Sequence, residues 1–178
     1  MSDLSREEKL QVWLAAEAEI RARLKPGTMS IAEVATLSPM EFFDGIGRGE
    51  LPAPPIGELM GFVPIEWSKE RFIFQGVPQM QHYNPIGSVH GGYAATLLDS
   101  AMGCAVHTHL QQGQGYTTTD LRISYIRALT TSTGPVRAEG RIIHVGRSTA
   151  LAEGRIYDVD GKLYATGSTT CLILGNKG

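Results

Sequence analysis

The sequence predicts an α+β domain in which an antiparallel sheet wraps around one long helix. Residues 89–109 are the long helical segment, with two strand-like runs before it and four after it. Polar hairpin signals separate consecutive strands, and strands joined by hairpins run antiparallel. A chain of 178 residues, 42% hydrophobic and 19% charged, is large enough to bury one core in this arrangement.

Residues 1–55 are predicted to be an N-terminal helical extension and linker, and residues 56–178 the compact domain. Leucines and a tryptophan mark one apolar face along residues 3–24, and a Pro-Gly pair then ends this helix. Ser38 and Pro39 suit the N-cap and the first position of a short second helix. The stretch GRGELPAPPIGE that follows is too rich in glycine and proline for regular structure and is typical of a linker or wrapping loop.

Six strand-like runs make up most of the compact domain. GFVPIEWS and RFIFQGV precede the long helix, and the loop QMQHYNPIGS leads into it. The four runs after the helix are YTTTDLRISYIRAL, GPVRAEGRIIHV, RSTALAEGRIYDV and KLYATGSTTCLIL. Polar and apolar residues alternate in VRAEGRIIHV and LAEGRIYDV, so each of these strands is expected to bury one face and to turn the other toward water or a ligand.

Charge and composition argue against several function classes. The formal net charge of -2 gives no basic surface for nucleic acid or for an anionic membrane. No apolar run approaches the roughly 20 residues of a membrane span, and the N-terminus lacks the apolar core of a secretion signal. The two cysteines, Cys104 and Cys171, lie in apolar segments and suit reduced thiols. We therefore expect a cytoplasmic protein with no nucleic-acid or membrane partner.

The long helix carries one carboxylate inside an apolar run. Gly92, Ala95, Asp99 and Gly103 share one face of the helix, so small residues lie on both sides of the carboxylate. Small side chains let another surface approach closely, and Asp99 is therefore expected at the floor of a contact or cleft. Asp99 is a candidate for chemistry; the alternative is a structural role as a local cap or a buried hydrogen-bond acceptor.

His90, Gly91 and Gly92 open this helix. The first turn of a helix has unpaired backbone N–H groups and a partial positive charge. Glycine lacks the Cβ that would keep a ligand oxygen away from those donors, so this helix start suits a phosphate or a developing oxyanion. The alternative is that the two glycines only permit a tight entry turn.

Gly91 and Asp99 are too far apart to act on the same group within one chain. They are eight residues apart, which is about 12 Å along a helix axis. If both act in one reaction, two subunits with antiparallel helices side by side must share the site. The enzymatic hypothesis therefore requires a homodimer at least.

Asn84, His90, Gly91 and Asp99 follow the pattern Asn-x5-His-Gly-x7-Asp. This pattern resembles the hotdog-fold acyl-CoA thioesterases of the phenylacetic-acid-degradation (PaaI-like) type. The similarity runs from about residue 57 to residue 174 and includes YNPIGSVHGGYAATLLDSAMG, TTTDLRISYIRAL and HVGRS. The resemblance implies a hotdog fold and hydrolysis of an acyl-CoA to free acid and CoA. It also implies a homodimer at least and favours a homotetramer. It implies no cofactor, because CoA is part of the substrate, and no metal.

The resemblance also implies roles for single residues. Gly91 would supply the oxyanion-hole N–H, and Asn84 and His90 would help to hold the thioester and the catalytic water. Asp99 of the partner subunit would act as general base or nucleophile, assisted by the hydroxyl of Thr118. The CoA nucleotide would contact two segments, Tyr125-Ile126-Arg127 and Gly146-Arg147-Ser148, in which the arginines suit phosphate groups.

The N-terminus departs from this pattern. The smallest members of the family begin near the first strand, whereas this chain has about 55 residues before it. These residues could cover the acyl pocket or pad an oligomer interface, and the resemblance favours neither. The acyl group itself, whether aromatic, short or medium in length, stays open.

Two rival functions remain compatible with the sequence. One is a hotdog hydratase or dehydratase acting on acyl thioesters, although the Asn-to-Asp spacing does not match such enzymes. The other is a non-catalytic acyl-CoA-binding module, which would not need Asp99. A zinc site is not expected, because His107 and His109 point to different helix sides and no Asp, Glu or Cys completes the set. The absence of G-x-S-x-G argues against nucleophile-elbow hydrolases.

Overall fold

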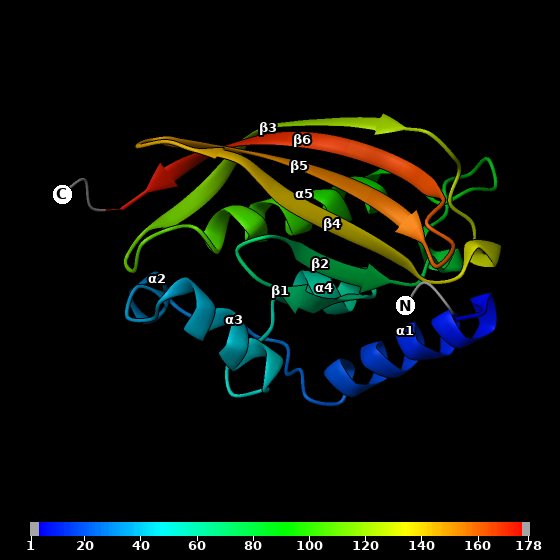
Figure 1. The fold of residues 1–178 in the computed structure, drawn as a ribbon, viewed down its shortest axis with the longest axis horizontal. Coiled ribbons are helices and arrows are strands. Elements are labelled where there is room, and N and C mark those ends of the chain that lie inside the picture. Colours follow the sequence, from blue (N-terminus) through cyan, green and yellow to red (C-terminus); the bar gives the residue numbers. More distant parts are fainter. Residues whose placement is uncertain (1–3, 176–178) are drawn as a thin grey trace.

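The computed structural model describes residues 4–175, and in this range it forms one six-stranded sheet that curves around helix α5, Gly91–His107 (Figure 1). The strands lie in the order β1-β2-β4-β5-β6-β3, and all neighbours are antiparallel. Their bounds are β1 Phe62–Trp67, β2 Phe72–Gly76, β3 Gly115–Tyr125, β4 Val136–Val145, β5 Thr149–Asp158 and β6 Leu163–Leu174. The predicted α+β arrangement and its six strands are confirmed.

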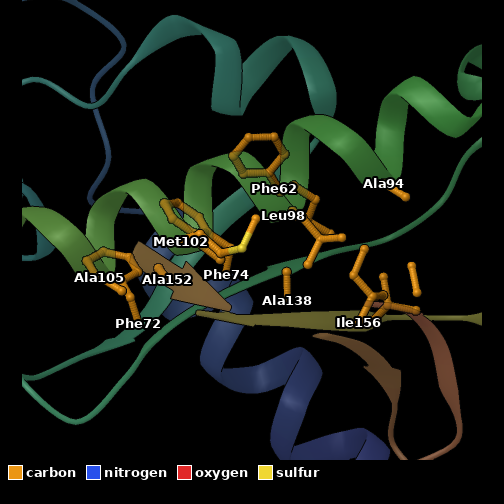
Figure 2. Close-up of a cluster of buried hydrophobic side chains, with 14 of the residues drawn as sticks. Phe62, Phe72, Phe74, Ala94, Leu98, Met102, Ala105, Ala138, Ala152 and Ile156 are labelled. Atoms are coloured by element: carbon orange, nitrogen blue, oxygen red, sulfur yellow. The ribbon is translucent and has the colours of Figure 1, made fainter. Parts of the chain in front are cut away.

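The core lies between α5 and the inner face of the sheet. Leu98 and Met102 of α5 are fully buried against aromatic side chains of β1 and β2 and small side chains of β4 and β5 (Figure 2). Gly140 of β4 allows the closest approach, because a Cβ there would lie 2.3 Å from the carbonyl oxygen of Ala101. Helix α5 therefore touches the backbone of the sheet, and this contact fixes the position of its carboxylate.

Helix ends and strand ends differ from the sequence predictions in a few places. The long helix begins at Gly91 because the side chain of His90 caps it. The third strand ends at Tyr125, since the next two backbone N–H groups both donate to the carbonyl of Tyr164. The prediction that GRGELPAPPIGE is entirely irregular is wrong: helix α4, Pro55–Met60, begins inside it. Proline at the first position favours this helix start, and Gly61 ends the helix in the left-handed conformation.

The segment before β1 contains four helices within the described range. Helix α1 confirms the predicted first helix, although the first residue predicted for it, residue 3, lies outside the described residues. Ser38 caps α3 with Pro39 at its first position, as predicted. The other two helices, and two 3₁₀ turns further along the chain, were not predicted. The bounds are α1 Arg6–Arg21, α2 Ile31–Val34, α3 Pro39–Gly47, α4 Pro55–Met60, η1 Met80–His82 and η2 Thr131–Thr133.

Helix α1 is held on the outer face of β2 and β4 by a buried polar network. The amide nitrogen of Gln75 donates to the carbonyl oxygen of Trp13 at 2.9 Å and to the carboxylate of Glu17 at 2.8 Å. Arg137 donates to the amide oxygen of Gln75 at 3.0 Å, and its guanidinium lies 4.0 Å from the ring centroid of Trp13. Because each buried polar group has a partner, the network fixes the register of α1 on the sheet.

Candidate active site

Asp99 lies near the middle of α5, half-buried, and accepts a hydrogen bond from the hydroxyl of Thr118 at 2.9 Å. The ladder between β3 and β6 has a β-bulge between Thr118 and Asp120. A bulge reverses the alternation of side chains, so Thr118 turns toward α5. Asp120 instead pairs with Arg122 at 3.2 Å. Thr118, which the resemblance names as the residue that assists Asp99, is thus hydrogen-bonded to Asp99 of the same chain.

Asp99 and Thr118 line a cavity of about 790 Å³. Two further polar groups line it beside them, the thiol of Cys104 and the phenol of Tyr116. Burial raises the pKa of Cys104 to about 12 and raises the pKa of Tyr116 well above its ordinary value. Both groups therefore stay protonated at neutral pH, so Cys104 is not available as a thiolate nucleophile.

The small-residue face of α5 is partly covered within the chain itself. A Cβ at Gly103 would lie 2.7 Å from the hydroxyl of Tyr116, so this glycine makes room for that ring. Gly92, Ala95 and Asp99 are only half-buried. The surface that remains open for a second molecule is therefore the stretch of α5 from its start to Asp99.

His90 and its neighbours organise the start of α5. The Nδ1 atom of His90 accepts a hydrogen bond from the N–H of Gly92 at 2.8 Å, so the proton of the neutral ring lies on Nε2. The N–H of Tyr93 donates to the carbonyl of His90 at 3.0 Å. Within residues 4–175, the N–H of Gly91 makes no hydrogen bond. Among the N–H groups of Gly91, Gly92 and Tyr93, that of Gly91 is therefore the one without an acceptor in the described chain.

Asn84 shapes the turn that leads into the helix. Its side-chain oxygen accepts hydrogen bonds from the N–H groups of Ile86 at 3.0 Å and Ser88 at 3.3 Å. Its amide nitrogen donates to the hydroxyl of Ser88 at 3.1 Å. Asn84 therefore closes an Asx turn in this chain, and this turn brings His90 and Gly91 to the helix start.

Tyr125 and Arg127 lie beside the helix start, as neighbours of His90 and Gly91. The four residues line a second cavity of about 280 Å³. The hydroxyl of Tyr125 donates to the carbonyl oxygen of Gly91 at 3.0 Å, and Arg127 donates to the carbonyl of Leu163. A Cβ at Gly91 would lie 3.1 Å from the Tyr125 ring, so glycine at this position also accommodates the tyrosine.

Gly146, Arg147 and Ser148 form the hairpin turn between β4 and β5 and stand apart from this group. The turn is closed by the hydrogen bond from the Gly146 N–H to the carbonyl of Thr149 at 2.8 Å. Thr149 pairs with Leu172 near one end of β6, whereas Tyr125 pairs with Ala165 near the other end. One protomer therefore places the two predicted CoA segments at opposite ends of the sheet, with Arg147 exposed.

The described residues also bear on metals and membranes. Among residues 4–175, no three His, Cys, Asp or Glu side chains gather as a metal-ion site would require. No helix in that same stretch is both long and apolar enough to span a membrane.

Residues of the N-terminal extension and of α4 also line the cavity at Asp99. They come from the end of α1, from the segment that follows it, from the segment before α4 and from α4 itself. These residues carry no local motif, because their common feature is a position beside the same cavity. Sequence reasoning therefore had no signal with which to find them.

The sequence is similar to those of several known proteins. The sequence profile of the thioesterase superfamily matches residues 86–165. A "Putative esterase" of Caenorhabditis elegans is 32% identical over 64% of this chain and 67% of its own length. The proofreading thioesterase EntH of Cronobacter turicensis is 27% identical over 70% of this chain and 92% of its own length.

A solved structure extends the comparison to the fold. The phenylacetic acid degradation-related protein of Ralstonia eutropha superimposes with a TM-score of 0.67 at 28% identity, covering 74% of this chain and 98% of that one. The chain belongs to the thioesterase superfamily and has the hotdog fold. The resemblance to PaaI-like proteins is confirmed, and so is the predicted enzyme class, a thioester hydrolase.

Proposed function

We propose that this protein hydrolyses an acyl-CoA to the free acid and CoA, with Asp99 as the base and the Gly91 N–H of a second subunit as oxyanion donor. One observation carries the proposal: the chain has an uncapped donor at the start of α5 and a hydroxyl-oriented carboxylate in its middle. The two are about 12 Å apart along the helix, so a single thioester can reach both only between two subunits.

In this reaction, Asp99 takes a proton from a water molecule as that water attacks the thioester carbonyl carbon. The carbonyl oxygen becomes an oxyanion and is stabilised by the N–H of Gly91 and the partial charge of the helix start. The Nε2–H of His90 is free to donate to the same oxygen, because Nδ1 accepts from Gly92. Collapse of the intermediate breaks the C–S bond, the CoA sulfur leaves and takes the proton from Asp99, and the carboxylic acid remains. Direct attack by Asp99 as a nucleophile is the variant of this mechanism.

The proposed homodimer would bring the separated groups together. Strand β3 is at the edge of the sheet, so one side of its backbone has no strand partner among residues 4–175. Its side chains include Leu121, 36% exposed, and Tyr125, 57% exposed. Such an edge is suited to pair with another strand, and pairing of two β3 edges related by a twofold axis would set two antiparallel α5 helices side by side. The proposal also includes the association of two such dimers into a homotetramer.

The proposed CoA contacts are divided between the two ends of the sheet. Tyr125 and Arg127 lie next to the oxyanion donor, and Gly146, Arg147 and Ser148 lie at the opposite end. An antiparallel pair of subunits turns these ends toward one another. The exposed guanidinium of Arg147 is then available for a nucleotide phosphate.

The test is release of free thiol from acetyl-, octanoyl- and phenylacetyl-CoA by the wild type and by Asp99→Ala. Hydrolysis is expected in the wild type and should be abolished in the variant, with the circular dichroism spectrum and CoA-ester binding retained. Near-normal turnover by Asp99→Ala would contradict the mechanism. Binding without hydrolysis by the wild type would favour an acyl-CoA-binding module, and loss or gain of enoyl absorbance without thiol release would favour a hydratase.

A further inference from the structure

The cavity at Asp99 is lined by both polar and apolar residues. The polar residues include Asp99, its helix neighbour Ser100 and its hydrogen-bond donor Thr118. Part of the apolar lining, called the wall below, comes from the N-terminal extension and α4, with Leu24, Pro26, Ala53, Pro54 and Ile56. These five residues have no charged or hydrogen-bonding side chain, so the wall suits an apolar group whose reacting end faces the carboxylate.

The wall is attached to the domain at several points. The N–H of Gly27 donates to the carbonyl of Ala53 at 2.9 Å, and the N–H of Ala53 donates to the carbonyl of Lys25 at 2.8 Å. The two segments of the wall are therefore bridged to one another. Helix α1 is pinned to β2 through Gln75, and α4 continues directly through Gly61 into β1.

Besides Asp99, two charged residues line the cavity, Arg21 and Glu58, and Arg21 forms an ion pair. The guanidinium of Arg21 pairs with Glu17 at 2.8 Å and donates to the carbonyl of Gly61 at 2.8 Å. Arg21 therefore ties α1 to the start of β1, and its charge is balanced by Glu17. Glu58 of α4 is exposed, and its negative charge would repel an anionic acyl group.

We infer that the N-terminal extension, together with helix α4, forms the acyl-binding wall of this enzyme and selects an apolar acyl group much larger than acetyl. This inference rests on the proposed function for the acyl thioester, and it assigns the specificity to Leu24 and Ile56 in particular. A cavity of about 790 Å³ holds a medium-length chain. Each methylene group that enters such a site strengthens binding by about fourfold.

The experiment measures binding of two CoA thioethers that cannot be hydrolysed, octyl-CoA and ethyl-CoA, by calorimetry on the full-length protein. The wild type is expected to bind octyl-CoA at least about tenfold more tightly than ethyl-CoA. Ile56→Trp should remove this preference by filling the cavity, and Ile56→Asn should reduce it by placing an amide on the wall. Ile56 is 44% exposed, so neither variant has to repack a core.

Leu59→Trp and Leu59→Asn are the matched controls. Leu59 is in the same short helix, is 71% exposed and does not line the cavity. Both control variants should keep the wild-type preference for octyl-CoA. An unchanged preference in the Ile56 variants, an equal change at Ile56 and Leu59, or no preference in the wild type would each overturn the inference.

Hydrolysis of the matching thioesters separates this inference from the proposed function. If octanoyl-CoA binds with the expected dependence on Ile56 and is not hydrolysed, the thioesterase proposal fails and the acyl wall stands. If thioesters are hydrolysed with no dependence on Ile56, the thioesterase proposal stands and the acyl wall fails.

Discussion

The hydroxyl of Thr118 donates a hydrogen bond of 2.9 Å to the carboxylate of Asp99, across the gap between β3 and α5. A hydroxyl that donates to one carboxylate oxygen fixes the plane of the carboxylate and leaves the second oxygen to accept a proton from water. The β-bulge next to Thr118 is the backbone feature that turns the hydroxyl toward α5.

Thr118→Val should lower kcat by about 10- to 100-fold, which corresponds to the loss of a hydrogen bond to a charged group. KM should change little, because the hydroxyl is assigned to the carboxylate and not to the ester. Steady-state kinetics on one acyl-CoA tests this. Thr119→Val is the control, since the Thr119 hydroxyl donates to the carbonyl of Thr170 instead; equal effects of the two substitutions would contradict the assigned role.

Gly91→Pro should lower kcat by about 10²- to 10³-fold, because proline removes the oxyanion donor and is tolerated at the first position of a helix. Gly91→Ala keeps the N–H while adding a Cβ near Tyr125, and it should retain most activity. Mixing inactive Gly91→Pro chains with inactive Asp99→Ala chains should restore about a quarter of the activity, since half of the random dimers then hold one intact shared site. No recovery from dimers shown to have exchanged subunits would rule out a shared site.

Arg147→Ala should raise KM for CoA esters by about tenfold, as expected for loss of a charge-assisted contact to phosphate. The same substitution should leave hydrolysis of a small thioester without the nucleotide unaffected. Comparison of the two substrates tests the assignment. Arg122→Ala, which removes another exposed arginine of the sheet, is expected to change neither value. Equal losses with both substrates in Arg147→Ala would remove the proposed nucleotide contact.

Stability is expected to fall as the pH drops below about 6.5. Burial lowers the pKa of His107 and of His82, so the unfolded state takes up protons first. The contribution of the two neutral histidines to the free energy of unfolding is fully present above the unfolded-state pKa of about 6.5. As the pH falls from there toward the folded-state pKa, the free energy of unfolding drops by at most about 1.4 kcal/mol per pH unit for each histidine. Urea unfolding between about pH 8 and about pH 5 measures the slope.

His107→Phe should make this slope shallower. The ring of His107 packs among those of Phe42, Phe43 and Tyr116, at centroid distances of 5.5, 5.2 and 5.8 Å, so a phenyl ring fits the same surroundings. A slope identical to that of the wild type would show that His107 is not one of the groups responsible.

Gln75→Leu should destabilise the protein by about 2 kcal/mol, because it leaves the buried carboxylate of Glu17 without one of its donors. Urea unfolding followed by tryptophan fluorescence is suitable, since Trp13 belongs to the same network. Gln11→Leu, on the exposed face of α1, should have little effect. A loss of similar size in both variants would mean that the network contributes nothing specific.

The sequence was sufficient for elements whose signals are local. Ser38 and Pro39 marked a helix start, and the apolar face of α5 followed from residue spacing. Helix α4 was missed because Pro54 at its N-cap, Pro55 at its first position and Gly57 are typical of a loop, yet proline is acceptable in a first turn. The boundary of β3 depended on a hydrogen bond to Tyr164, a partner about 40 residues away, and no local pattern contains it.

The candidate site divides in the same way. The spacing of His90, Gly91 and Asp99 was visible in the sequence because all three lie on one helix. The bond from Thr118 to Asp99 followed from the family resemblance, and the structure supplies its cause in the bulge. The turn-forming role of Asn84 and the wall at Ile56 depend on contacts of the folded chain, so neither could be predicted.

The network that pins α1 has a consequence for the order in which the chain assembles. Gln75 and Arg137 each hold a partner 62 residues away in the sequence. On the ribosome, α1 leaves the exit tunnel before β2 and β4, and the reciprocal bonds of Ser5 and Glu8 at its start are local to the helix. Its docking surface is complete only after β4 has been synthesised, and contacts of such high separation form slowly. Helix α1 is therefore made before the strands that hold it and is expected to dock late, and until then the cavity at Asp99 lacks part of its lining.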